Sequence, residues 1–556
     1  MAREVGAGGR GIKRWIRYGL YLLAFGFGFF AIGAEEPYQG LLGAVVCLWG
    51  GNMVYALERL RERILFFLLH VTLFTFLIGR PVITVLRGQQ WWDYGHENVM
   101  FALSSLLVTL LFLYLGALLG QQRSLRLRKG QPGGLCLERG GGRWEDGRME
   151  ESFAHAFRYY LSWVSQIVFY LSLLFTFMLG QEKIAYIADH TYYEYFVEFK
   201  SGLPYIVYEL STLTRYSLCF FLACLPKKSR AFPALSLYVL AAAPELIVGE
   251  RNPIVLRVIF ALSYYVLRDL YRERQEEDPV PFRGRSRSKS SKWGSPRSRS
   301  AERKLPQDRG AGRRPLQTGS KDQERPWIGR LEKAALMAGI PCGLVFLGMM
   351  DYMREDRVRK SLGLLDTIVD LFYKQGVSFQ WLALGHGVIE ELPGEGAFHY
   401  TVGSFIDYFA HGSVAQRFFG AVPLGTNNSL VKATLGHSLA HHMSYLVMGP
   451  EEYLAGHGCG SSYLLELFID HGYLGICVFS LGLGCLLLVG PELARRDTFI
   501  FALLLLCMTN LFLIPRAEAL GFLTFVLTLQ FWAAAAICCG GALLLCRRFY
   551  PRKRHL

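Results

Sequence analysis

Charged residues are scarce in this chain, and their scarcity argues against a soluble globular protein. Only 19% of the 556 residues are charged, whereas 52% are hydrophobic. Apolar runs recur along most of the chain, and many reach the length of about twenty residues that a helix needs to cross a bilayer. A soluble core does not need so many runs of this length. The sequence therefore predicts an all-α, polytopic membrane protein.

The chain also lacks the fingerprints that would define several enzyme classes. Most of its 12 cysteines lie inside apolar runs, so no disulfide framework is indicated. It has no P-loop, no dinucleotide fingerprint and no nucleophile elbow. A cleavable signal peptide is not expected, because no small-residue cleavage site is evident and a second apolar run closely follows the first.

Hydropathy predicts about twelve membrane spans: Trp15–Ala34, Tyr38–Leu57, Ile64–Leu86, Asn98–Gln121, Tyr159–Gly180, Pro204–Leu225, Ala231–Val248, Asn252–Tyr271, Ile328–Asp351, Ser462–Gly490, Thr498–Ile514 and Ala517–Cys546. Alternate connections between these runs are rich in Lys and Arg, which places them in the cytoplasm together with both termini. The formal charge of +15 is thereby explained by orientation, and no nucleic-acid partner is expected.

Two long connections divide the chain into regions. The one rich in Arg and Ser is expected to be a disordered cytoplasmic loop, because its composition cannot bury enough apolar surface. The other is moderately apolar and is expected outside, where it could fold as a cap or groove. The predicted regions are 1–271 with eight spans, 272–327 as the basic loop, 328–351 as the ninth span, 352–461 as the external loop, and 462–556 with three spans and a basic tail.

Arg215 is an arginine in the middle of a predicted span. Such a position costs about 2.5–3.5 kcal/mol on insertion scales. Glu209 precedes it by six residues, which places the two side chains about 120° apart around a helix and makes them poor partners. We therefore expect Arg215 to face an interior cavity, with a structural salt bridge to another span as the alternative.

The segment Gly249–Pro253 lies at a predicted outer connection. Asn252 suits a helix N-cap and Pro253 suits the first helical position, so the next helix should begin here. Free N–H groups at a helix start and the charge of Arg251 together indicate a site for phosphate or pyrophosphate. The alternative is that Arg251 pairs with Glu250 or with Glu245.

A glycine-rich segment precedes the tenth predicted span, where Ser461 or Ser462 could cap the helix. Glu466 and Asp470 follow one turn apart on one face. Like charges at this spacing repel, so one carboxyl could serve as a general base or bind a sugar. The alternative is a capped interfacial helix with solvated carboxylates.

His437 and His441 have the i,i+4 spacing that could hold zinc, but the metalloprotease Glu and a Cys pair are missing, so no metal is expected. His441 is a candidate for proton transfer or for contact with a sugar, and a solvated loop histidine is the alternative. Arg516, between the last two spans, is a second candidate for anion binding.

Short motifs occur in the segments Gly249–Pro253, Gln375–Ser378, Gly403–Asp407, Gly458–Tyr463 with Glu466, and Gly472–Gly475. Together they resemble those of the Wzy-type oligosaccharide repeat-unit polymerases, in the branch named O-antigen polysaccharide polymerase. The resemblance covers residues 10–270 and 330–545, and the Arg/Ser-rich loop departs from it by its length and charge.

The resemblance implies a glycosyltransferase at the outer face of a bacterial cytoplasmic membrane. Such enzymes transfer a glycan en bloc from undecaprenyl pyrophosphate to a sugar hydroxyl of a new lipid-linked repeat unit, without a cofactor. It also implies a GT-C-like helical bundle with the external loop as a roof, and a chain-length regulator as a possible partner.

In this mechanism, Arg251, Arg215 and Arg516 would stabilise the leaving pyrophosphate, and Glu466 or His441 would accept the proton of the acceptor hydroxyl. Further substrate contacts are expected from Asn252, Glu250, Ser461, Ser462 and Asp470. An O-antigen ligase uses the same donor and is the first alternative. A transporter of lipid-linked glycans is the second, although the inverted repeats typical of transporters are not evident.

Deletion of residues Gly284–Arg325 is predicted to leave polymerisation largely intact, because this stretch is expected in the cytoplasm and the chemistry outside. Arg272, Arg274 and Arg330 would remain to maintain orientation. Polysaccharide ladders from a complemented deletion strain measure the effect. A protein that inserts normally but makes no polymer would show that the loop has a role in the reaction.

Overall fold

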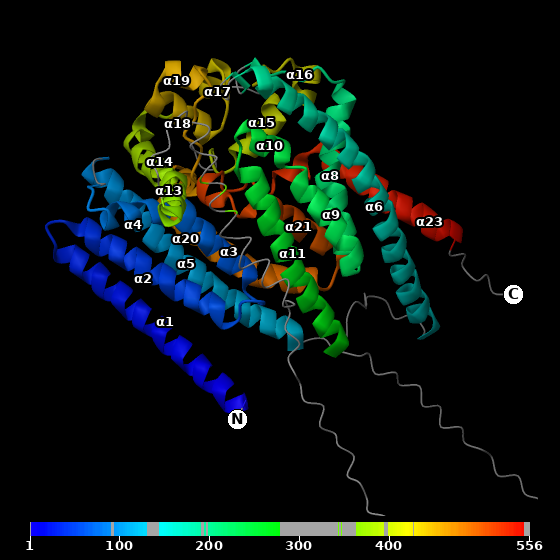
Figure 1. Ribbon diagram of the computed structural model, residues 1–556, viewed down its shortest axis with the longest axis horizontal. Coiled ribbons are helices and arrows are strands. Elements are labelled where there is room, and N and C mark those ends of the chain that lie inside the picture. The colour runs from blue at the N-terminus through cyan, green and yellow to red at the C-terminus, as the bar shows by residue number, and fades with distance from the viewer. Residues whose placement is uncertain are drawn as a thin grey trace, which may run out of the picture.

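The computed structural model describes residues 2–90, 94–129, 144–190, 194–195, 198–277, 343, 346, 348, 363–393, 399–425 and 428–549. Every regular element in this part of the chain is a helix (Figure 1). The all-α prediction is thus confirmed for the described residues. Apart from three isolated positions, the predicted ninth span, Ile328–Asp351, lies outside them, as does most of the basic loop.

The N-terminal helices follow the predicted spans closely. They are α1 (Ala2–Gly33), α2 (Pro37–Glu58), α3 (Ile64–Leu73), the π-helix η1 (Phe74–Ile78), α4 (Gly79–Leu86) and α5 (His96–Lys129). The helices α3, η1 and α4 continue one another, so a single predicted span contains a π-helical turn. The next helices are α6 (Trp144–Asp189), α8 (Tyr205–Ala223), α9 (Lys228–Leu240), α10 (Ala243–Val248) and α11 (Asn252–Glu277).

The described part of the predicted external loop folds into short helices. They are α13 (Leu364–Gln375), α14 (Val377–Gly387), the 3-10 helix η2 (Ile389–Glu391), α15 (Gly403–His411), α16 (Ser413–Phe419), α17 (Leu430–Leu435), α18 (Leu439–Met448) and α19 (Pro450–Leu454). Helices α15 to α19 gather at the end of the bundle opposite the N-terminus (Figure 1). We call α13 to α19 the cap.

The C-terminal part begins with α20 (Tyr463–Ala494), which bends at Gly472 in a left-handed conformation with φ of 60°. It continues with α21 (Thr498–Leu511), the 3-10 helices η3 (Ile514–Arg516) and η4 (Thr524–Leu527), α22 (Leu529–Ala535), the π-helix η5 (Ala536–Gly540) and α23 (Gly541–Phe549). The predicted start of the last span at Ala517 is therefore wrong. Residues 517–528 form turns and the 3-10 helix η4, and the α-helix begins only at Leu529, where the side chain of the N-cap Thr528 accepts from the backbone N–H of Phe531.

Eight stretches of described helix are long and apolar enough to cross a membrane: Gly11–Gly33, Pro37–Glu58, Ile64–Leu86, His96–Arg128, Phe153–Asp189, Lys228–Val248, Tyr463–Ala494 and Leu529–Phe549. The shorter helix α21 is also apolar. Helices α8 and α11 occupy two further predicted spans but are not among the eight. The polytopic character is confirmed, while the number twelve stays a prediction.

Three basic connections that were predicted to share one side of the membrane meet in space. Arg128, near the end of α5, pairs with Glu62 at 3.1 Å and with Glu492 at 3.0 Å. Glu492 also pairs with Arg495 at 3.0 Å. The ends of α2, α5 and α20 therefore lie together, while their placement on the cytoplasmic side stays a prediction.

Glycines allow α5 and α20 to pack with their backbones in contact. A Cβ atom on Gly116 would lie 2.1 Å from the carbonyl oxygen of Leu481, and one on Gly484 would lie 2.2 Å from that of Leu113. Small residues permit this close approach between helices in membranes. The contact holds the middle of α20, after its bend at Gly472, against α5.

Gly484→Ala is predicted to destabilise this contact, because the new methyl group would collide with backbone that has no flexible end to move. Overpacking of this kind costs about 1–3 kcal/mol, and thermal unfolding of the full-length protein in detergent measures it. Gly482→Ala is the matched control, since nothing lies within 4 Å of the position of its Cβ. Equal unfolding temperatures for the two variants would contradict the prediction.

Candidate active site

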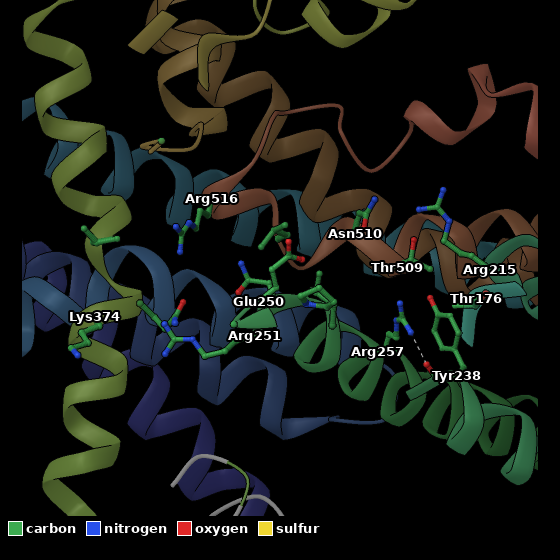
Figure 2. Close-up of a pocket in the computed structure, with 18 of the residues that line it drawn as sticks. Thr176, Arg215, Tyr238, Glu250, Arg251, Arg257, Lys374, Thr509, Asn510 and Arg516 are labelled. Carbon is green, nitrogen blue, oxygen red and sulfur yellow. Dashed lines mark hydrogen bonds between the residues drawn. The ribbon is translucent and has the colours of Figure 1, made fainter. Parts of the chain in front are cut away.

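A cavity of about 980 Å³ lies where the bundle meets the cap, and its walls are strongly basic. Among the residues that the structure describes, Glu250 is its one lining carboxylate, whereas six cationic side chains border it: Arg80, Arg215, Arg251, Arg257, Lys374 and Arg516. Arg251, Lys374 and Arg516 lie toward one side of the cavity, and Arg215 and Arg257 lie toward the other (Figure 2). This excess of positive charge suits a multiply charged anion.

The connection between α10 and α11 forms one wall of the cavity. Gly249 ends α10 in a left-handed conformation with φ of 104°, which glycine adopts without steric cost. Helix α11 begins at Asn252, one residue before the predicted start, so Arg251 takes the N-cap position. Asn252 and Pro253 line the cavity, which brings the first turn of a helix to an anion site.

Acidic residues near this wall have other cationic partners. Glu245 lies 3.6 Å from Lys183 and 3.9 Å from Arg257. Burial raises the pKa of Glu250, although the charge of Lys183 opposes the shift. A partly protonated Glu250 would neutralise less of the charge of the cavity.

Arg215 faces the cavity from α8, as its position in the sequence predicted. Its guanidinium donates to the hydroxyl of Tyr216 at 2.8 Å and lies 4.8 Å from the centre of that ring. Glu209 instead accepts from Gln530 at 2.8 Å, which agrees with the helical spacing. Among the described ion pairs, none includes Arg215.

Three of the cavity's cations were missed or given little weight by sequence reasoning. Arg257 donates to the carbonyl oxygen of Tyr238 at 3.0 Å, and the Arg80 guanidinium lies 4.6 Å from the ring centre of Tyr373. Arg257 lies inside a predicted span, so the argument used for Arg215 could have found it. Lys374 gave no comparable signal, because its place depends on how the cap packs.

Glycines from two of the motifs that carry the family resemblance lie in contact with arginines at the edge of the cavity. A Cβ atom on Gly376 would lie 2.4 Å from the Cβ of Arg80, so glycine lets the α13–α14 corner approach α4. Gly460, with φ of 77°, would place a Cβ 3.7 Å from the carbonyl oxygen of Arg516. Gly456, His457 and Gly458 line the cavity directly.

The structure does not bring Glu466 to the lining of this cavity. Its side chain is fully buried, and its carboxylate accepts from Ser461 at 2.5 Å and from the backbone N–H of Ala519 at 2.8 Å. Ser462 occupies the N-cap position of α20 without a side-chain cap bond. The expected catalytic use of Glu466 and the expected sugar contacts of Ser461 and Ser462 stay predictions, and this geometry gives them no support.

Asp470 likewise binds backbone. Its oxygens accept from the N–H of Tyr400 at 3.2 Å and from that of Thr401 at 2.6 Å. The two carboxylates therefore have separate donors although they are one turn apart. Asp470 connects α20 to the segment that leads into α15, which is a structural contact in the cap.

His441 is held by the cap near the glycine-rich turn. Its Nδ1 lies 3.0 Å from the hydroxyl of Tyr453, which also lies 3.2 Å from the carbonyl oxygen and 3.3 Å from the backbone N–H of Ser429. When this hydroxyl donates to the carbonyl oxygen, Nδ1–H of His441 donates to the Tyr453 oxygen and the lone pair of the ring is on Nε2. Burial and then Lys432 lower the pKa of His441 to about 4, so the ring is neutral at pH 7.

His437 does not pair with His441, although their spacing allowed it. Its Nδ1 instead lies 2.8 Å from a carboxylate oxygen of Asp407. Among the described residues, one group of three side chains has the geometry to hold a metal ion, and it consists of Asp407, His411 and His437.

The chain matches one protein family over most of its length. Residues 16–277 and 316–548 match the family described as O-antigen polysaccharide polymerase Wzy. No curated protein and no solved structure matches the chain. The matched residues include every cation of the cavity and the whole described cap. The chain therefore belongs to the O-antigen polysaccharide polymerase Wzy family.

Proposed function

We propose that the protein is a glycosyltransferase that joins undecaprenyl-pyrophosphate-linked repeat units en bloc at the outer face of the cytoplasmic membrane. The observation that carries this proposal is the cavity with six cationic side chains and one carboxylate. When the growing glycan leaves its lipid, negative charge develops on the pyrophosphate. Cations already in place around that charge lower the barrier without reorganising.

The arginines approach the cavity from separate elements, and this arrangement suits a ligand with several anionic oxygens, such as a phosphate, better than a single carboxylate. Arg251 lies at the start of α11, so its guanidinium and the first N–H groups of the helix can contact different oxygens of one anion. Arg516 approaches from the turn before α22 and Arg215 from α8. Glu250 and Asn252 would orient the groups next to the pyrophosphate.

His441 is the proton acceptor that we propose for the acceptor hydroxyl. In the tautomer that this role requires, Nδ1–H donates to the hydroxyl of Tyr453, 3.0 Å away, and the lone pair of the neutral ring is on Nε2. Tyr453 also belongs to the segment that precedes Gly456 and His457 at the cavity wall, where Asn428 donates to the carbonyl oxygens of Tyr453 and His457 at 2.8 and 2.9 Å. Neither His441 nor Glu466 lines the cavity, but His441 is partly exposed whereas Glu466 has no exposed surface.

The same proposal assigns a topology. Both termini and residues 272–327 would lie in the cytoplasm, twelve spans would form a GT-C-like bundle, and residues 352–461 would cover the reaction outside. The position of the cap opposite the N-terminus (Figure 1) supports this arrangement. A chain-length regulator would contact the protein within the same membrane.

Arg251→Ala is predicted to lower the polymerisation rate by about 10²–10³-fold, the usual loss for one charge-stabilising donor. Arg251→Lys should also lose most activity, because lysine keeps the charge but not the planar fork. Purified protein with a lipid-linked repeat unit as its only sugar substrate, without nucleotide, measures the rate. Arg417→Lys, at an exposed arginine of α16, is the control.

The products of this assay distinguish the alternatives. A ladder spaced by one repeat unit supports the polymerase, whereas transfer only to a different lipid acceptor would favour an O-antigen ligase. Movement across the bilayer without a new glycosidic bond would favour a transporter. Wild-type ladders from Arg251→Ala would overturn the proposed anion site.

His441→Gln is predicted to lower the rate by about 10²–10⁴-fold, the range for loss of a general base, without weakening lipid binding to the same extent. With a pKa of about 4, His441 loses its free lone pair only below that pH. The wild-type rate should therefore stay level from pH 8 to about pH 5 and fall as the pH approaches 4.

Glu466→Gln tests the competing assignment, since glutamine keeps an oxygen that can accept from Ser461 or Ala519. A folded Glu466→Gln protein that binds substrate but makes no polymer, together with an active His441→Gln protein, would transfer the role of base to Glu466. Gel filtration and thermal unfolding show whether each variant is folded.

A further inference from the structure

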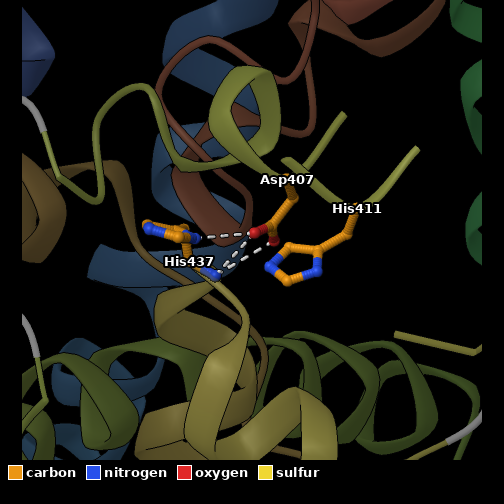
Figure 3. Close-up of side chains that lie close together, drawn as sticks. All are labelled: Asp407, His411 and His437. Atoms are coloured by element: carbon orange, nitrogen blue, oxygen red, sulfur yellow. Dashed lines mark hydrogen bonds and ion pairs between the residues drawn. The ribbon is translucent and has the colours of Figure 1, made fainter. Parts of the chain in front are cut away.

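A group of metal-binding side chains lies in the cap, apart from the residues that line the basic cavity. Asp407 and His411 are one helical turn apart on α15, and His437 comes from the connection between α17 and α18. One potential ligand atom from each residue lies within 4.8 Å of the other two. Figure 3 shows the three side chains converging from these two segments.

The hydrogen bonds of His411 leave one ring nitrogen directed into this group. Its Nδ1–H donates to the carbonyl oxygen of Val422 at 2.9 Å, so the lone pair is on Nε2. The ring of His411 faces Asp407 and His437 (Figure 3). A carbonyl that fixes the tautomer of a metal-binding histidine is a common arrangement behind metal ligands.

Asp407 and His437 already contact each other. The carboxylate accepts from the backbone N–H of His437 at 2.9 and 3.0 Å and from its Nδ1–H at 2.8 Å. This pairing explains why Asp407 and His437 lie together. It does not explain why the Nε2 atom of His411 points toward them. A metal ion in the place of the Nδ1 proton would bind all three.

A further nitrogen lies beside the group. The ring centre of His399 is 4.7 Å from that of His437, and the Nε2 atom of His399 is buried without a hydrogen-bond partner. Buried ring nitrogens usually have a partner. Binding of a metal at Nδ1 of His437 moves the ring proton to its Nε2 atom, for which His399 is a neighbouring acceptor.

We propose that Asp407, His411 and His437 bind one divalent transition-metal ion, with Zn²⁺ as the best fit. Two imidazoles and one carboxylate suit zinc, whereas calcium and magnesium prefer oxygen ligands alone. In a tetrahedral site, zinc–ligand bonds of about 2.0–2.2 Å place two ligands about 3.3–3.6 Å apart. The three ligand atoms now lie within 4.8 Å of one another, so the group must close by about 1 Å to bind the ion. The side chains of Asp407 and His437 are 19% and 23% exposed, which leaves a path for the ion.

The ion would connect α15 to the segment before α18. Both of these segments also form a hydrogen bond to Glu518, a residue close to the cavity. Ser404 on α15 and Ser438 before α18 both donate to the carboxylate of Glu518, the second at 3.1 Å. Glu518 is two residues after Arg516, which lines the cavity. Metal binding would therefore brace the cap where it supports the arginine, and this role does not depend on the reaction proposed above.

Metal content of the full-length protein tests the site. The protein is purified in detergent through a tag without histidine, incubated with Zn²⁺, and passed over a desalting column before elemental analysis. We expect about one Zn²⁺ per chain in the wild type and at least a tenfold loss in His411→Ala and His437→Ala. His190→Ala is the control, because His190 lies outside the cap and its Nδ1 only donates to Tyr186.

Two further readouts separate metal binding from folding. Co²⁺ in place of Zn²⁺ should give visible absorption bands in the wild type that His411→Ala lacks, and Zn²⁺ should raise the unfolding temperature of the wild type but not of His411→Ala. His411 is the safest position to change, because its ring makes one backbone hydrogen bond. A wild type that retains no Zn²⁺, or a His411→Ala protein that retains as much as the wild type, would overturn the proposal.

Discussion

Positive charge that carboxylates neutralise only in part is the constraint on which this structure depends: Arg257 lies 3.9 Å from Glu245 and Lys374 lies 3.9 Å from Asp370, whereas no described ion pair includes Arg215. Cations in a partly buried cavity lose solvation, and carboxylates would restore stability but cancel the charge. Here a tyrosine hydroxyl holds Arg215, a backbone carbonyl holds Arg257, and an aromatic ring lies beneath Arg80. Ring faces and neutral oxygens stabilise a guanidinium while its charge stays available to an anion. Glu245 is shared by Lys183 and Arg257, and Glu250 has its pKa raised by burial.

The cavity exists only because separate elements meet at one point. Its cations come from α4, α8, the α10–α11 connection, α11, α13 and η3. Close packing at glycines makes this meeting possible: Gly376 admits the corner of the cap against α4, and Gly484 admits α5 against α20. The carboxylates of Glu466 and Asp470 then attach α20 to the loop after α21 and to the cap. Glu466 and Asp470, which were expected to take part in catalysis or sugar binding, therefore hold the elements around the cavity in place.

Local signals in the sequence predicted part of this site, and packing decided the rest. Arg251, Arg215 and Arg516 could be found because each is an arginine where a membrane protein seldom places one. Lys374 could not be found in this way, because nothing in its own segment marks it. Its position at the cavity depends on how the cap packs against α4. Spacing placed Glu466 and Asp470 on one face but could not show that backbone N–H groups of distant residues would bind them. The helices themselves were predictable from hydropathy, except that the last span begins at Leu529, after an apolar stretch that forms turns and a 3-10 helix.

The π-helix η1 has a consequence for how the site arose. Phe74–Ile78 carries a wider turn within an otherwise α-helical span, and Arg80 follows it directly. A π turn accommodates one extra residue, and each residue turns an α-helix by about 100°. Without that residue, everything after Ile78 would rotate by this angle, and Arg80 would turn away from the cavity while the span kept its hydrophobic length. A single inserted residue is thus sufficient to turn the side chain of Arg80 toward the cavity. Insertion or deletion of one codon could therefore add or remove a positive charge at the site while the fold stays the same.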